Sequence, residues 1–199
     1  MAWFYNSFRP LLNTSAGRAA VHRFALPPFI DGSCRREPDF ESEFPSISGL
    51  CRKDKFAPRI HVGDIAIYVT TKGGWGRRLV AILRVRERYE SHDEAAVWYQ
   101  ELGLPLPSNC WVEGNPPIPY ERTVQDSPER SWDIDYRRRS RTYPTFLVTD
   151  PLFRELHDPP QVTDAMLVDS FGRIPGTQNP PRVPEDRARR LLELAGVEL

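Results

Sequence analysis

The sequence contains few lysines, and this shortage shapes its charge. Lys53, Lys55 and Lys72 are the only lysines among 27 lysines and arginines, so arginine carries most of the positive charge. The formal net charge is zero, which argues against a protein that binds polyanions through bulk charge alone. Arginine presents a planar fork of donors that suits phosphates, base edges and carboxylates. A GC-rich gene would also favour arginine, so both explanations stay open.

Cysteines are scarce as well, and long apolar runs are missing. Cys34, Cys51 and Cys110 are an odd number without close spacing, which predicts neither a disulfide framework nor a zinc site. No apolar run approaches the roughly 20 residues that span a membrane. The N-terminal segment has no apolar stretch followed by a cleavage site of small residues. We therefore expect a cytoplasmic protein without membrane contact.

Familiar catalytic motifs are also missing. The four histidines are scattered, and there is no GxSxG nucleophile elbow. TTKGGWGRR (70–78) lacks the GxxxxGK[ST] pattern at a helix start that defines a phosphate-binding P-loop. The sequence therefore predicts no metal and no cofactor. Catalysis stays open, because acid–base chemistry by Asp31, Glu37 or Glu113 depends on spatial neighbours.

The length and composition predict one domain with many rigid loops. The chain has 199 residues, 40% of them apolar, and 20 prolines against 12 glycines. We expect a single domain over 1–199, with a core at about 20–175 and a C-terminal helix at 184–196. Two loops are long: a polar loop at 27–45 and a proline-rich loop at 104–128.

Hydrophobic periodicity predicts the elements of this domain. Strands are predicted at 21–26, 63–71, 77–89, 145–150 and 165–171. Helices are predicted at 46–54, capped by Ser46; at 91–103, with Ser91 and Glu94 as a capping box; and at 184–196. The order lacks regular strand–helix alternation. It favours an α+β fold in which a mixed, mostly antiparallel sheet forms a small β-barrel with peripheral helices.

The strands predicted at 63–71 and 77–89 are expected to be buried on both faces where the first ends and the second begins. In the first, Ile65 and Ile67 alternate with Tyr68 on the opposite face. In the second, Leu79 and Ala81 are predicted to share one face.

The glycine-rich turn between these strands, within 70–78, has two interpretations. One is an ordinary tight turn with a loosely placed tryptophan. The other places a ligand beside the turn, where Trp75 stacks on a base and Lys72 meets phosphates. Tyr68 and Thr71 would then contact the same ligand.

DGSCRREPDFE (31–41) alternates arginines with carboxylates. Internal ion pairs that order the loop are one explanation. In the other, Arg35 or Arg36 faces a ligand and a carboxylate holds the guanidinium in place.

SNCWVEGN (108–115) also allows two roles. Asn109 could read a base edge and Trp111 could supply a stacking surface. Alternatively, Trp111 pins a long loop to the body of the protein. The basic run at 133–141 is predicted to be a solvated surface, with phosphate contacts as the alternative.

The middle of the chain resembles the PUA-like superfamily, which includes the EVE, YTH and ASCH domains. HVGDIAIYVTTKG (61–73) followed by RRLVAILRVRERYESHDEAAVWY (77–99) is similar to its Gly-Asp turn, two apolar strands and helix. CRKDKFAPRI (51–60) before the turn and SFGRIP (170–175) after it make the order similar to the nucleotide-modification-associated domains of bacteria and phages. The resemblance covers roughly 20–175.

This resemblance implies a small mixed β-barrel that recognises nucleic acid, often through a modified base in an aromatic pocket. The residues that match by position are Ser48, Cys51 and Arg52 before the turn; Tyr68, Thr70 and Thr71 on the following strand and its exit; and Trp75 or Trp111 as walls of the pocket.

Three functional hypotheses follow. The first is a module that binds nucleic acid, DNA or RNA, or a nucleotide; the ten basic residues against three acidic ones in 52–88 favour it. The second is an enzyme on nucleotides or modified bases that uses the carboxylates and arginines of 31–41. The third is an interaction module of a defence or mobile-element system, whose helix at 184–195 contacts a protein partner or a second copy of the chain.

Overall fold

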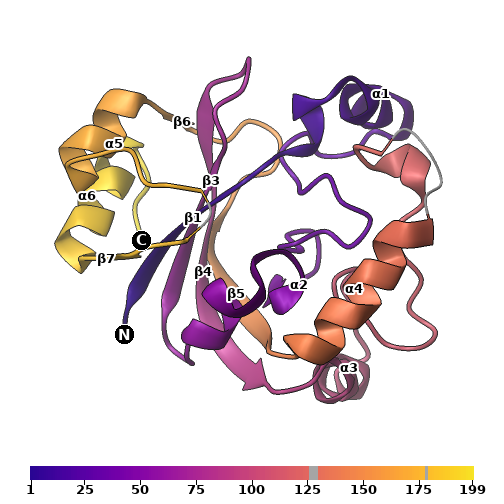
Figure 1. Ribbon diagram of the computed structural model, residues 1–199. Helices are drawn as coiled ribbons and strands as arrows, with labels where there is room; N and C mark the ends of the chain where they lie inside the picture. Colours follow the sequence, from indigo (N-terminus) through magenta and orange to yellow (C-terminus); the bar gives the residue numbers. More distant parts are fainter. Residues whose placement is uncertain (126–129, 178) are drawn as a thin grey trace.

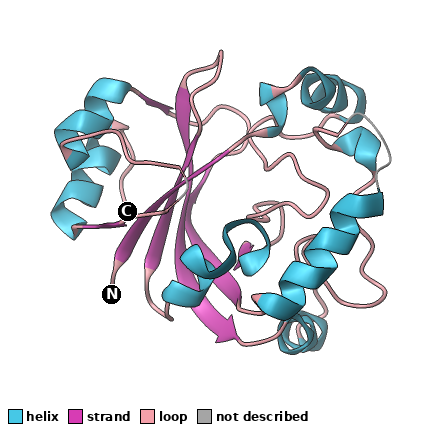
Figure 2. Cartoon of the chain, viewed as in Figure 1, coloured by secondary structure: helices cyan, strands magenta, loops and turns pink. Residues whose placement is uncertain are grey.

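A mixed sheet runs through the centre of the molecule, with helices on both of its sides (Figure 1, Figure 2). This computed structural model describes residues 1–125, 130–177 and 179–199. The strands are β1 (Trp3–Phe8), β2 (Ser46–Ser48), β3 (Ile65–Thr70), β4 (Arg77–Tyr89), β5 (Phe146–Arg154), β6 (Gln161–Val162) and β7 (Arg182–Val183). The α-helices are α1 (Ser15–Phe24), α2 (Gly49–Arg52), α3 (His92–Glu101), α4 (Arg130–Thr142), α5 (Asp164–Phe171) and α6 (Glu185–Leu194). Short 3-10 turns lie at Leu11–Asn13, Lys53–Lys55, Ala57–Arg59 and Tyr120–Arg122.

The sheet is mostly antiparallel, as predicted. Within the described residues its order is β2-β5-β4-β3-β1-β7, with β6 paired to the start of β4. Only β1 and β3 run parallel among these pairs. The α+β class is therefore confirmed. The pairings place β2 and β7 at opposite ends and do not close the described strands into the predicted barrel.

Both faces of β3 are buried, which confirms the predicted alternation. Ile65 and Ile67 pack on one side in a cluster with residues of α5 and α6. Tyr68 packs on the other side with Phe40 of the 27–45 loop. Figure 1 shows the corresponding layers, with α5 and α6 on one side of the sheet and α1, α2 and α4 on the other.

The alternation predicted for β4 is wrong at one point. Leu79 packs in the cluster beneath α5 and α6, whereas Ala81 packs with Tyr68 on the opposite face. The register shifts between Tyr68 and Val69, whose partners are Ala81 and Leu79. Val80 is therefore an extra residue in a β-bulge, and such an insertion reverses the facing of the residues that precede it.

Two segments predicted as strands are helical instead: 165–171 lies in α5, and 21–24 of the predicted strand 21–26 form the last turn of α1. Thr14 and Thr163 cap these helices, because each side chain accepts a backbone N–H of the first turn. A short apolar run gives the same signal for a buried strand and for a buried helix, so periodicity alone did not distinguish them.

The segment 46–54 is divided among strand β2, helix α2 and the 3-10 turn at Lys53–Lys55 rather than forming one helix. Ser46 belongs to strand β2, and Ser48 caps the short helix α2 by accepting the N–H of Leu50 at 3.2 Å. The basic run at 133–141 lies in α4, which packs on α2 through a hydrogen bond from Arg139 to the Leu50 carbonyl (2.8 Å).

The helices predicted at 91–103 and 184–196 are confirmed as α3 and α6. Ser91 accepts the N–H of Glu94 at 3.1 Å and so caps α3. The apolar stripe of α6, which includes Leu191, packs against the sheet of this same chain. That stripe is therefore not free for a partner. No helix in the described part of the chain has the length and apolar character needed to cross a membrane.

Strand β1 was not predicted, and it extends the sheet beyond the expected core of 20–175. Its six residues are all buried between β3 and β7. The Gly-Asp turn holds it in place: Asp64 accepts the N–H of Ala2 at 2.6 Å and that of His61 at 3.0 Å. The carboxylate therefore joins the N-terminus of the chain to the entrance of β3.

Replacing Asp64 by alanine should lower the free energy of unfolding by about 1–3 kcal/mol, because two backbone donors lose a charged acceptor. Urea denaturation measures this change. Asp54→Ala, at an exposed residue, is the matched control and should leave stability nearly unchanged. Equal stabilities of the two variants would contradict the role given to Asp64.

Candidate ligand-binding site

The 27–45 loop is buried beside the sheet, and its two adjacent arginines hold other parts of the protein. Arg35 and Arg36 are each only 1% exposed. The Arg35 guanidinium pairs with Asp133 at 2.7 Å and donates to the Asn115 carbonyl at 2.9 Å. That of Arg36 lies 2.5 Å from the Glu41 carboxylate and donates to a backbone carbonyl of the loop. These contacts are the internal ion pairs of the first interpretation.

Asp31 lies in this loop with one carboxylate oxygen fixed and the other free. Oδ1 accepts from the Ser33 N–H (2.9 Å), the Ser33 hydroxyl (2.5 Å) and the Glu37 N–H (3.2 Å). Oδ2 has no hydrogen-bond partner among the residues that the structure describes. The whole residue is only 8% exposed. Asp31 is therefore a rigidly held acceptor with unused capacity.

Glu37 is held by two residues that the sequence nominated as ligand contacts. Its Oε1 accepts the Ser48 N–H at 2.8 Å, and its Oε2 contacts the Ser48 hydroxyl. Asn109 donates to Oε2 at 3.1 Å and is itself fixed by Ser46, whose hydroxyl donates to the amide oxygen at 2.6 Å. Ser48 and Asn109 thus hold the Glu37 carboxyl group in position, although neither of them lines the pocket described below.

Burial changes the acid–base behaviour of both carboxyl groups. It raises the pKa of Glu37 to about 8, and the charge of Asp31 adds to this effect. Burial also raises the pKa of Asp31, against the three hydrogen bonds that favour its charged form. Glu37 therefore keeps its proton at neutral pH.

Both carboxyl groups line a pocket of about 260 Å³ at the end of β1. Its walls include Asn6, Ser7, Phe8, Arg9, Asp31, Glu37, Pro38, Cys51, Arg52, Phe56 and Tyr68. Three of these side chains have a buried polar atom without a partner among the described residues: Asn6 Oδ1, Ser7 Oγ and Tyr68 Oη. Most buried polar groups in proteins are paired, so this concentration marks a place where a ligand or water completes the structure.

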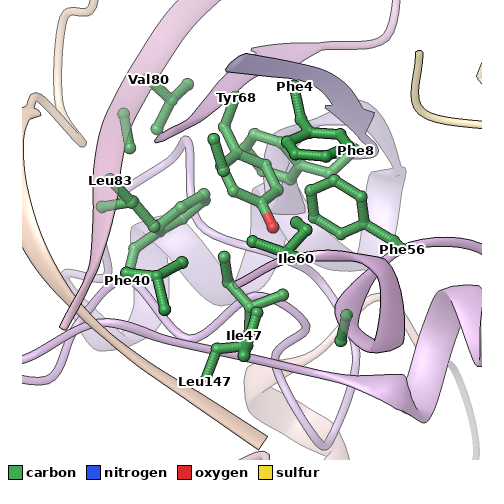
Figure 3. Close-up of a cluster of buried hydrophobic side chains, with 14 of the residues drawn as sticks. Phe4, Phe8, Phe40, Ile47, Phe56, Ile60, Tyr68, Val80, Leu83 and Leu147 are labelled. Carbon is green, nitrogen blue, oxygen red and sulfur yellow. The ribbon is translucent and has the colours of Figure 1, made fainter. Parts of the chain in front are cut away.

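Aromatic rings form one wall of this pocket. Tyr68 makes edge-to-face contacts with Phe8 and Phe56, at ring-centre distances of 6.2 and 6.1 Å. Figure 3 shows the three rings close together, with the Tyr68 hydroxyl extending into the cluster. Burial raises the pKa of Tyr68 well above its ordinary value, so the phenol stays neutral and can donate or accept a hydrogen bond.

Positive charge lies at the same pocket. Arg52, in the last turn of α2, donates to the backbone carbonyls of Ser7 and Thr177. Arg9 is exposed at the end of β1. Cys51 precedes Arg52 and is also exposed. The pocket therefore combines buried acceptors with a basic margin.

The structure places the remaining predicted residues outside this pocket. Thr70 accepts the N–H of Arg78 at 2.9 Å, and Thr71 donates its N–H to the Phe8 carbonyl at 2.8 Å. Lys72 forms an exposed ion pair with Asp164 at 2.6 Å. These contacts stabilise the ends of the sheet.

The two tryptophans lie apart from the Glu37 pocket and from each other. Trp75 is 53% exposed and lines a separate hollow of about 390 Å³ with Phe29 and Arg78. Trp111 lines a third hollow of about 590 Å³. Its indole N–H donates to Asp133 at 3.1 Å, and this contact pins the proline-rich loop to α4. The structure describes that loop only as far as residue 125.

Sequence reasoning missed Asn6, Ser7, Phe8 and Phe56 because it did not predict β1 or its neighbours. The available signal was two adjacent polar residues, Asn6 and Ser7, inside the aromatic run WFYNSF.

Within residues 1–125, 130–177 and 179–199, no group of three or more His, Cys, Asp and Glu side chains is placed to hold a metal ion. We also compared the chain with protein-family models, curated proteins and solved structures, and none of them matches it.

Glu37→Gln should change the pH dependence of stability. Because the pKa of Glu37 rises from an ordinary 4.5 to about 8, the folded protein keeps a proton that the unfolded chain releases. The contribution of Glu37 is therefore complete below pH 4.5 and is lost as the pH rises to 8, by about 1.4 kcal/mol per unit. Urea denaturation between pH 5 and pH 8 should show this loss in the wild type and not in the variant.

The exposed Glu121→Gln variant is the control and should keep the wild-type slope. Identical slopes for the wild type and Glu37→Gln would show that Glu37 is not buried in its protonated form.

Proposed function

We propose that the protein is a cytoplasmic nucleotide- or nucleic-acid-binding module of the PUA-like type, and that the pocket beside Glu37 accepts a nucleobase. One observation carries this proposal: aromatic walls and three unpartnered buried polar atoms meet in a single pocket. Each unpartnered atom costs about 1–3 kcal/mol, which a hydrogen-bonding ligand would recover. A flat ring with polar edges has the chemistry to match both features.

The basic margin supports a ligand that also carries phosphate. Arg52 is held by backbone carbonyls, so its guanidinium is already ordered before a ligand arrives. Arg9 adds an exposed guanidinium beside the same opening. Arginine is well suited to phosphate recognition because its donors form a planar fork.

The resemblance to the PUA-like superfamily adds further support. Of the residues that it nominates by position, Cys51, Arg52 and Tyr68 share the pocket. In the full form of the proposal the sheet corresponds to a PUA-like barrel and the base carries a modification. Phe8 and Phe56, rather than the two tryptophans, would then be its aromatic neighbours beside Tyr68.

Tyr68→Phe separates binding from stability. It removes only a hydroxyl that has no hydrogen-bond partner among the described residues, so stability should stay unchanged or rise. Affinity for nucleoside monophosphates should fall about fivefold or more, because the ligand loses a hydrogen bond. Isothermal titration calorimetry and urea denaturation measure the two effects.

Tyr120→Phe, outside the pocket, is the matched control and should keep wild-type affinity. The same titrations with modified and unmodified oligonucleotides at two salt concentrations test the nucleic-acid form of the proposal. Absence of binding to every nucleotide and oligonucleotide would overturn it.

A second candidate function is an enzyme that acts on nucleotides or modified bases. The observation that favours it is Glu37 itself: a buried carboxyl in a pocket, with a pKa of about 8, suits general acid–base catalysis near neutral pH. Glu37→Gln should abolish turnover while the protein stays folded. Chromatography of nucleotides incubated with each protein measures turnover, and substrates left intact by the wild type would exclude this function.

A further inference from the structure

The polar groups of the Glu37 pocket differ in what they can recognise, and one of them is an unambiguous acceptor. Hydroxyl groups such as Ser7 and Tyr68 donate or accept, and an amide such as Asn6 has both kinds of atom. An ionised carboxylate only accepts, and the three hydrogen bonds that Asp31 accepts favour its ionised form. Asp31 is therefore the group that imposes a hydrogen-bond direction on a ligand.

The loop fixes this direction before any ligand binds. Three donors hold Oδ1 of Asp31, namely the N–H and hydroxyl of Ser33 and the N–H of Glu37. Oδ2 has no hydrogen-bond partner among the described residues, and Asp31, a buried residue, lines the pocket. A buried carboxylate strongly favours a ligand that brings an N–H group to it.

Nucleobases divide into two classes with respect to this requirement. Cytosine and adenine carry an exocyclic amino group that donates. Uracil and hypoxanthine have a carbonyl oxygen at the corresponding position, and it would face the Asp31 carboxylate as one acceptor facing another. The two classes are nearly identical in shape, and the exchange also turns the neighbouring ring nitrogen from an acceptor into an N–H donor. A discrimination between them therefore comes from hydrogen bonding, here from the contact between Asp31 and the exocyclic group.

We propose that the pocket selects nucleobases that carry an exocyclic amino group over their keto counterparts, and that the free oxygen of Asp31 makes this selection. The proposal rests on the proposed nucleotide-binding function and specifies the ligand class of the same site. Asp31 acts here as a specificity-determining residue that contacts the ligand, while Ser33 is a positioning residue.

Paired nucleotides test the selection directly. Calorimetric titration with CMP and UMP, and with AMP and IMP, compares ligands that differ in the amino-to-carbonyl exchange. For at least one pair the wild type should bind the amino form about tenfold more tightly or better, the range expected for a specific base-edge contact. Equal affinities within both pairs would overturn the selection but leave nucleotide binding standing. Absence of binding to all four would overturn both proposals.

Asp31→Asn should reverse the direction of the contact. The oxygen of the new amide can still accept the hydrogen bonds from the N–H and hydroxyl of Ser33. Its NH₂ group then takes the place of Oδ2 and donates to a carbonyl of the ligand. The preference for the amino form should fall to about one or invert, while the keto form binds as tightly as before or more tightly. Asp54→Asn removes the same charge from an exposed residue outside the pocket and should keep the wild-type ratio.

Ser33→Ala keeps the conclusion testable if Asp31→Asn is poorly folded. It removes one of the three donors that hold Oδ1 and leaves the carboxylate in place. The amino-to-keto ratio should fall about twofold to fivefold, because a less restrained carboxylate discriminates less. A ratio that is unchanged in every folded variant would show that Asp31 does not select the base.

Discussion

The buried carboxyl group of Glu37 joins three segments that are far apart in the sequence. It belongs to the 27–45 loop, it accepts the N–H of Ser48 at the start of α2, and it accepts the amide of Asn109 in the proline-rich loop. Each of these partners is almost completely buried, so water cannot replace a lost contact. Together with the contacts of Arg35 and Trp111 to Asp133, this group holds both long loops against the body of the protein, and it also shapes the pocket that it lines.

The abundance of arginine has a structural explanation in the same loops. Backbone carbonyls in a buried loop have no strand or helix to pair with, and they need donors from elsewhere. Arg154 donates to the carbonyls of Phe40 and Ser42, and Arg35 donates to those of Ser108 and Asn115. One guanidinium can serve several carbonyls at once because its donors are fixed in a fork. Many of the arginines thus replace the secondary structure that the loops lack.

The polar atoms of the pocket differ from these loop carbonyls, because several of them have no hydrogen-bond donor or acceptor beside them. Among the described residues, Asn6, Ser7 and Tyr68 each have a buried polar atom without a hydrogen-bond partner, although neighbouring segments are densely hydrogen-bonded. An apolar side chain at any of these positions would avoid the cost of desolvation. Binding and catalytic sites often retain polar groups that lower the stability of the free protein, because the same groups interact with a ligand. This contrast is the physical reason for placing function here rather than at the exposed Trp75.

Sequence periodicity determined the centre of the fold: β3, β4, α3 and α6 were all predicted, because their apolar spacing and caps are local properties. Tertiary structure alone decided which face Leu79 occupies, since a bulge at Val80 reverses the alternation. It also decided that the charged 27–45 loop is buried. Charge patterns predicted ion pairs there but not their partners, because Arg35 meets Asp133 across 98 positions of sequence. The pocket needs β1, this loop and α2 together, and only folding brings them into contact.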